Sequence, residues 1–80
     1  MMKRALIIKE PSTKIAVKSS HVETVSLYET QYIGLNQLYG VYIAQEVTVN
    51  VKALVALAKV LPVYFTTAEG KLLSKVSLQV

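Results

Sequence analysis

The chain contains no cysteine and no tryptophan, and its 80 residues include no aspartate. Without cysteine, neither a disulfide nor a cysteine-ligated metal can stabilise so short a chain. The absence of cysteine also fits a reducing cytoplasm. Stability must therefore come from the packing of hydrophobic side chains, which make up 52% of the sequence.

Residues that carry catalysis are equally scarce. The acidic residues are five glutamates, spread over positions 10, 23, 29, 46 and 69, and His21 is the one histidine. A metal-dependent site needs several convergent carboxylate or histidine ligands, and a serine triad needs a histidine that an acid orients. We therefore predict no catalytic, cofactor-binding or metal-binding residue in this chain.

Long hydrophobic runs are missing as well. A membrane-spanning helix takes about 20 consecutive apolar residues, and no run in this sequence approaches that length. The start of the chain has only four apolar residues, Ala5 to Ile8, before Lys9, which is too few for a signal peptide. We expect a cytoplasmic protein with no membrane partner.

One segment of the sequence has the pattern of a helix. Residues 51–61 are apolar except for Lys52 and Lys59, which are seven positions apart and therefore share a helix face. The pattern predicts a helix over about 51–61 that is buried on most sides. Asn50 is suited to cap its start, and Pro62 ends it because proline cannot continue a helix without losing a hydrogen bond.

The rest of the sequence is typical of short strands. Eight runs are apolar or alternate between apolar and polar residues, and turn residues separate them. They are residues 4–9, 14–18, 22–28, 32–34, 39–44, 47–49, 62–65 and 71–80. We expect the first two runs to form a hairpin. In the third, Val25 and Leu27 are expected to face the core while Thr24 points outward.

These elements predict an α+β domain that is mostly β: a small β-sandwich of short antiparallel strands and hairpins, with one buried helix at about 51–61. No repeat or linker is visible, so residues 1–80 are interpreted as a single β-rich N-terminal domain. Strand-like sequence continues to Val80, as expected of a piece of a longer protein. The predicted structural core consists of Val49, Leu54, Leu57, Leu61, Val63 and Phe65.

The charge balance gives a limited indication of function. Nine basic residues and five acidic ones give a net charge of +4, a mild attraction for phosphate rather than a nucleic-acid signature. Lys9, Lys14 and Lys18 are the candidates for contact with a DNA backbone; the alternative is an ordinary solvated face. The five tyrosines are interpreted as packing residues of strands, with stacking on single-stranded nucleic acid as the alternative.

The order of the elements resembles a known family. A β-rich start is followed by four further segments: Val-Tyr-Ile-Ala at 41–44, Val-Thr-Val-Asn-Val-Lys-Ala-Leu at 47–54, Leu-Pro-Val-Tyr-Phe at 61–65 and Glu-Gly-Lys-Leu-Leu at 69–73. This order resembles the N-terminal domain of the CRISPR-associated adaptation integrase, the Cas-one family, over essentially all 80 residues. Gln45 and Val60 stand where family members often carry glycine. A β-branched residue such as Val60 disfavours the left-handed conformation in which many helices end.

The resemblance implies the N-terminal structural and dimerisation domain of a CRISPR spacer-acquisition DNA integrase and endonuclease. It implies a homodimeric parent that works with a small companion adaptation subunit on double-stranded or forked DNA, in a bacterial or archaeal cytoplasm. It also implies that the parent's Mg²⁺ or Mn²⁺ ligands belong to a helical C-terminal domain outside this chain. The alternative is a free-standing β-rich module that binds protein or RNA.

Overall fold

The computed structural model of the chain describes residues 2–76. These residues form seven strands, one α-helix and one short 3₁₀ helix, η1. The elements are β1 (Arg4–Ile8), β2 (Lys14–Val17), β3 (His21–Val25), β4 (Thr30–Gly34), η1 (Leu35–Gln37), β5 (Leu38–Ala44), α1 (Val51–Val60), β6 (Val63–Thr66) and β7 (Leu72–Lys75).

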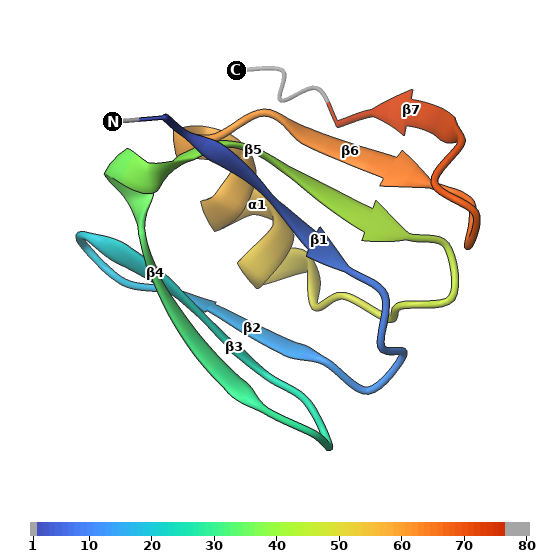
Figure 1. The fold of residues 1–80 in the computed structure, drawn as a ribbon, viewed down its shortest axis with the longest axis horizontal. Coiled ribbons are helices and arrows are strands. Elements are labelled where there is room, and N and C mark those ends of the chain that lie inside the picture. The colour runs from blue at the N-terminus through green and yellow to red at the C-terminus, as the bar shows by residue number, and fades with distance from the viewer. Residues whose placement is uncertain (1, 77–80) are drawn as a thin grey trace.

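The strands form two sheets with α1 beside them (Figure 1). A three-stranded sheet has the order β2-β3-β4 and is antiparallel throughout. The four-stranded sheet has the order β1-β5-β6-β7, and its β1–β5 and β5–β6 pairs are parallel. The predicted α+β class, mostly β with one helix, is confirmed. The expectation of antiparallel strands is wrong for these two pairs, whereas β6 and β7 do pair antiparallel.

The parallel pairing of β5 with β6 follows from the helix between them. Parallel neighbours need a crossover connection of a dozen or more residues, and a helix is its usual content. Residues 45–62 provide this crossover, with α1 at its centre. The expected strand at 47–49 does not form, because these residues belong to the connection that leads into α1.

The expected hairpin between the first two strands is also wrong. The Thr13 amide donates a hydrogen bond to the Glu10 carbonyl oxygen at 3.0 Å, and this turn leads the chain from one sheet into the other. Strand β1 pairs with β5 instead. That pairing places Leu6 and Ile8, which are both buried, beside buried residues of β5. The gain in apolar burial explains why β1 pairs there rather than with the half-buried β2.

The start of α1 agrees with the prediction. The Asn50 side chain accepts a hydrogen bond from the Lys52 amide at 2.8 Å. At the other end, Leu61 is extended and its amide still bonds the Leu57 carbonyl oxygen at 2.9 Å. Val60 therefore stays helical, and the helix ends through an extended residue before proline, with no left-handed residue at its exit.

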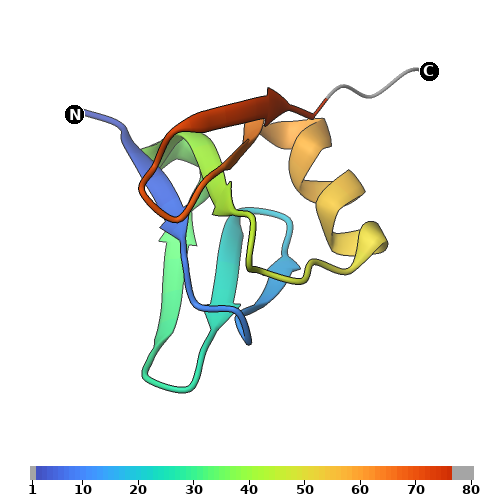
Figure 2. The ribbon, with the colours of Figure 1, turned by 90° about the vertical axis from the view of Figure 1, so that its right-hand side faces the viewer.

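Burial of α1 is less complete than expected. Leu57 is the one helix residue that is fully buried, whereas Val51 and Val60 at the two ends are exposed. Figure 2 shows one side of the helix that neither sheet covers. The prediction of a helix buried on most sides is therefore wrong, because a domain of this length has no further layer to cover that side.

The core lies between the two sheets and the inner side of α1. Its buried residues are Leu6, Ile8, Val22, Ile33, Leu38, Val41, Ile43, Leu57, Leu61 and Val63. Of the six residues named from the sequence, three are in this buried cluster. The other three, Val49, Leu54 and Phe65, are partly buried and pack against it.

Strand β3 has the opposite orientation from the one predicted. Val22 and Thr24 are buried, while Val25 and Leu27 are exposed. A shift of one residue moves every side chain of a strand to the other face. Pairing of Val22 with Ile33 of β4, which is also buried, selects this orientation.

The hairpin between β6 and β7 is confirmed. Gly70 turns the chain with a φ of 93°, a left-handed conformation that glycine adopts without strain. The Thr67 hydroxyl also accepts the Lys71 amide at 3.0 Å. The expected last strand over 71–80 corresponds to β7, and residues 77–80 lie outside the described residues.

Candidate nucleic-acid interface

The three lysines named from the sequence are all exposed, but they do not lie together. Lys14 is the first residue of β2 and Lys18 follows its last, whereas Lys9 follows β1. Lys14 and Lys18 border hollows beside α1, and Lys9 borders a different hollow on the other sheet. Two of the three predicted residues therefore share one surface.

Strand β2 and the start of α1 enclose a groove, which we call the β2–α1 groove. It consists of two hollows of about 460 and 440 Å³, which share Asn50 and Ala53. Lys14 lines the first hollow, and Lys18 and Lys52 line the second. The groove lies where α1 approaches β2, and Ala53 lines both of its hollows.

The β2–α1 groove is electropositive. Three lysines line it, and none of its described lining residues is acidic. The first turn of α1 adds the partial positive charge of a helix N-terminus. Lys52 was overlooked as a candidate, although its position in the first turn, two residues after the Asn50 cap, was visible in the sequence. The groove is suited to an extended anion such as a nucleic-acid backbone.

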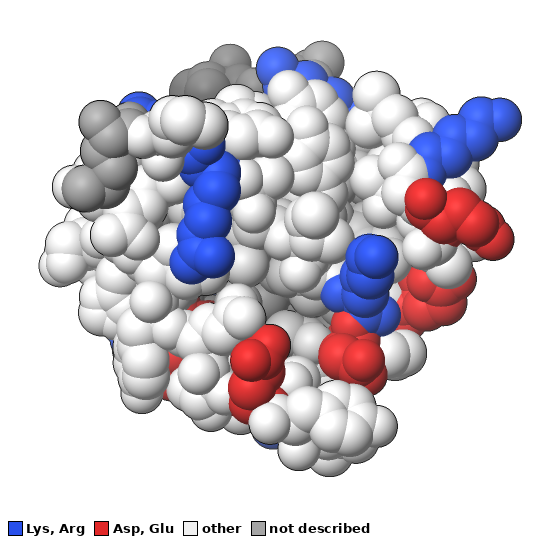
Figure 3. Space-filling model, viewed as in Figure 1, with Lys and Arg blue, Asp and Glu red and all other residues white. Residues whose placement is uncertain are grey.

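Lys9 belongs to the outer face of the four-stranded sheet. It borders a hollow of about 270 Å³ together with Ile7, Tyr39 and Tyr42. In Figure 3, uncharged surface occupies the middle of this view, with one basic side chain to its left and another to its right. Acidic side chains gather at the lower right, where β1 and β5 end in Figure 1. Any contact that Lys9 makes is therefore separate from the β2–α1 groove.

Two of the tyrosines are engaged with each other on that outer face. The rings of Tyr42 and Tyr64 stack with centroids 5.0 Å apart and planes at 18°. The Lys75 Nζ lies 5.9 Å from the Tyr64 centroid, within reach of a cation–π contact. These ring faces are therefore used within the sheet, which favours the packing interpretation over base stacking for this pair.

The described residues also bear on metal sites and membrane spans. Among residues 2–76, no group of three or more histidine, cysteine, aspartate or glutamate side chains is placed to hold a metal ion. The His21 ring instead contacts the Tyr32 ring, with centroids 5.8 Å apart. No helix in the described part of the chain has the length and apolar character that a bilayer span requires.

Comparison of the sequence with known proteins finds no matching family model and no similar curated protein. Comparison of the fold gives a different result. The fold matches part of a partial Cas6-RT-Cas1–Cas2 complex with a TM-score of 0.72, at 17% identity over 99% of this chain. It also matches a CAS1 protein from Thermotoga maritima with a TM-score of 0.70, at 17% identity over 95% of this chain. The chain has the fold of the N-terminal region of Cas1.

A Cas6-RT-Cas1–Cas2 complex gives a third match, with a TM-score of 0.70 and 18% identity over 99% of this chain. The chain spans 24% of the length of the first two matched chains and 9% of the third. The resemblance to Cas1 that the sequence indicated is thus confirmed in the fold. The similarity covers 95 to 99% of this chain, and so both sheets and the helix.

Proposed function

We propose that this chain is the N-terminal structural and dimerisation domain of a CRISPR spacer-acquisition integrase, and that it contacts DNA at the phosphate backbone. The observation that carries the proposal is the match to the Cas1 fold over 95 to 99% of the chain. Catalysis with Mg²⁺ or Mn²⁺ is assigned to the rest of such a protein, because this sequence has no aspartate and one histidine. The working environment is then a bacterial or archaeal cytoplasm.

The proposed DNA contact is the β2–α1 groove. Lys14 and Lys18 are four residues apart along an extended strand, so their Cα atoms are separated by about 13 Å. They can therefore reach different phosphates of one duplex, and Lys52 supplies a third ammonium from the helix. Lysine acts here as a flexible point charge that binds phosphate without reading base edges. Lys9 is proposed as a separate and weaker contact.

A salt titration tests this contact. Fluorescence anisotropy would measure binding of a labelled duplex to the wild type and to a Lys14→Gln, Lys18→Gln, Lys52→Gln variant over a range of salt concentrations. The slope of log affinity against log salt should become shallower by up to about 0.9 for each phosphate that the variant no longer binds. The matched control removes three other exposed lysines, with Lys59→Gln, Lys71→Gln and Lys75→Gln. Equal slopes in the two triple variants would contradict a groove-specific contact.

Dimerisation is proposed through the β7 edge and the outer face of the four-stranded sheet. Strand β7 is an edge strand, and its Leu72 and Leu73 are 57% and 52% exposed. Ile7 on the outer face is 60% exposed. Edge strands with unpaired amides and exposed apolar residues favour pairing with a second copy, and a two-fold dimer is the commonest closed form. A Cas2-like companion subunit is proposed because two of the matched structures are Cas1–Cas2 complexes.

A further inference from the structure

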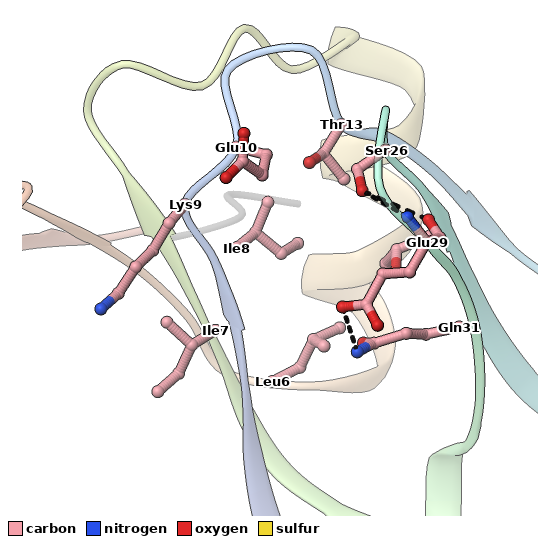
Figure 4. A pocket seen from close by; sticks show the side chains of 10 residues that line it. Leu6, Ile7, Ile8, Lys9, Glu10, Thr13, Ser26, Glu29 and Gln31 are labelled. Atoms are coloured by element: carbon pink, nitrogen blue, oxygen red, sulfur yellow. Dashed lines mark hydrogen bonds between the residues drawn. The ribbon is translucent and has the colours of Figure 1, made fainter.

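A second kind of pocket lies between the end of β1 and the β3–β4 hairpin (Figure 4). We call it the hairpin pocket, and its volume is about 160 Å³. The Glu10–Thr13 turn forms one side, and the facing side comes from the hairpin residues Ser26, Glu29 and Gln31. The chemistry of this pocket differs from that of the β2–α1 groove.

The hairpin pocket arises where the inner face of the three-stranded sheet changes from apolar to polar. Thr24 pairs with Gln31 across the β3–β4 ladder, and beyond it the Ser26 amide bonds the Glu29 carbonyl oxygen at 2.9 Å. Residues two apart on a strand share a face. The side chains of Thr24, Ser26, Glu29 and Gln31 therefore lie on the same face of the sheet as the preceding pair, Val22 and Ile33, which is buried and apolar. Polar groups are thus held at the open end of the core.

Two threonine hydroxyls in this pocket have no partner among the described residues. Thr13 and Thr24 are only 8% and 6% exposed, and neither side chain makes a hydrogen bond with another described residue. No side-chain oxygen or nitrogen in the described part is both fully buried and unpaired, so both hydroxyls reach the open space. Figure 4 shows the Thr13 oxygen pointing into the pocket. A bound donor group would therefore meet two hydroxyl oxygens that no other described residue uses as acceptors.

The pocket is rich in acceptors and acidic. Glu10 and Glu29 contribute carboxylates, and the Gln31 side-chain nitrogen donates to Glu29 Oε1 at 2.9 Å, which leaves the Gln31 oxygen as an acceptor. Lys9 borders the pocket, but Figure 4 shows its amine directed away from the other residues. The occupant that this arrangement favours is a cation with several hydrogen-bond donors, whereas a phosphate would be repelled.

Size and geometry narrow the class of cation. A metal ion needs ligands that converge within about 2.6 Å, and the described residues contain no such cluster of acidic or histidine side chains. The volume is close to that of a cavity of about 150 Å³ that accepts benzene, and is below the range of about 300 to 1,000 Å³ for typical small-molecule sites. Leu6 and Ile8 provide an apolar wall. An arginine side chain fits this description. Its planar guanidinium is a small cation with several hydrogen-bond donors, and its aliphatic stem can lie against the apolar wall.

We propose that the hairpin pocket binds an arginine side chain of a partner protein. The hairpin tip supports a protein partner rather than a free small molecule, because Leu27 and Tyr28 at the tip are 80% and 78% exposed. The Ser26 hydroxyl accepts hydrogen bonds from the amides of Tyr28 and Glu29, both at 3.2 Å, which stabilises the turn at the tip. Exposed apolar anchors beside an arginine pocket are the composition of a protein interface. The pocket and the β2–α1 groove share Thr13, but the acidic side chains line the pocket alone.

A titration followed by two-dimensional NMR tests the pocket, with N-acetyl-arginine amide as the probe. Saturable shifts are expected at Thr13, Thr24 and the Gln31 side-chain amide. A variant with Glu10→Gln and Glu29→Gln should bind at least about fivefold more weakly, because it removes two charge-assisted bonds. The control Glu69→Gln removes an exposed carboxylate outside the pocket and should bind as the wild type does. Absence of saturable shifts, or equal affinity in the double variant, would overturn the proposal.

Two further titrations distinguish a metal ion, a free guanidinium compound and an arginine of a protein as the occupant of the pocket. Calcium or magnesium chloride should leave the pocket signals unchanged, and saturable shifts with either salt but not with the arginine probe would assign the pocket to a metal. The peptide acetyl-Leu-Arg-Leu-amide should bind more tightly than N-acetyl-arginine amide, and Leu27→Ser with Tyr28→Ser should remove that gain. If the flanking leucines add no affinity, the pocket serves a free guanidinium compound and the protein partner is wrong.

Discussion

Replacing Leu57 by alanine tests whether α1 is docked as described. Leu57 is fully buried and belongs to the cluster between the sheets and the helix. Truncating a leucine at such a site costs about 3 to 5 kcal/mol, the sum of the reduced apolar burial and the cavity left behind. A domain of this length has a total stability of roughly 4 to 12 kcal/mol. The Leu57→Ala variant is therefore expected to lose a large part of its stability, or to be unfolded.

Two matched variants on the same helix make the result specific. Leu54 is partly buried, so Leu54→Ala should cost less, about 1 to 2 kcal/mol. Val51 is 73% exposed, and Val51→Ala should change the free energy of unfolding by no more than about 0.5 kcal/mol. Urea unfolding followed by circular dichroism, at two protein concentrations because self-association also stabilises, measures all three. Equal costs for Leu57→Ala and Val51→Ala would refute the docking of α1.

Three more predictions follow from single features of the chain. Asn50→Ala should cost about 1 kcal/mol because it removes the helix cap, whereas Asn50→Ser should keep most of the stability; equal melting temperatures for the two would contradict the cap. Gly70→Ala should cost about 1 to 2 kcal/mol from backbone strain alone, because no atom lies within 4 Å of the added methyl group, and an unchanged melt would disprove the left-handed turn. The purified chain should neither cleave nor join DNA with Mg²⁺ or Mn²⁺; turnover that disappears when its own glutamates are replaced would count against the assignment of catalysis to another domain.

Features that depend on neighbouring residues could be predicted from the sequence. The bounds of α1, its Asn50 cap and the turn at Gly70 each follow from local chemistry, and all three are present. The parallel sheet was missed although its signature was visible, since a strand, a helix and a second strand follow one another between residues 38 and 66. The sequence alone favoured hairpins because antiparallel neighbours need only short turns.

Features that depend on the tertiary arrangement could not be predicted. The orientation of β3 is set by its pairing with β4. The pattern of the sequence predicts the opposite orientation, in which Thr24 points to solvent and cannot line the core or the hairpin pocket. Glu10 and Glu29 lie far apart in the sequence and meet at one pocket only because the turn after β1 faces the β3–β4 hairpin. In the same way, Lys52 joins Lys14 and Lys18 only once α1 packs on β2.

We propose that this chain, which has the Cas1 fold, is a dimerisation domain, and sedimentation equilibrium tests that proposal most directly. The mass of one chain is 8.8 kDa. Data collected from micromolar to millimolar concentration should fit a reversible monomer–dimer equilibrium that ends at twice this mass. Replacing Leu72 and Leu73 by serine should shift the equilibrium toward the monomer. An ideal monomer over the whole concentration range would contradict the claim.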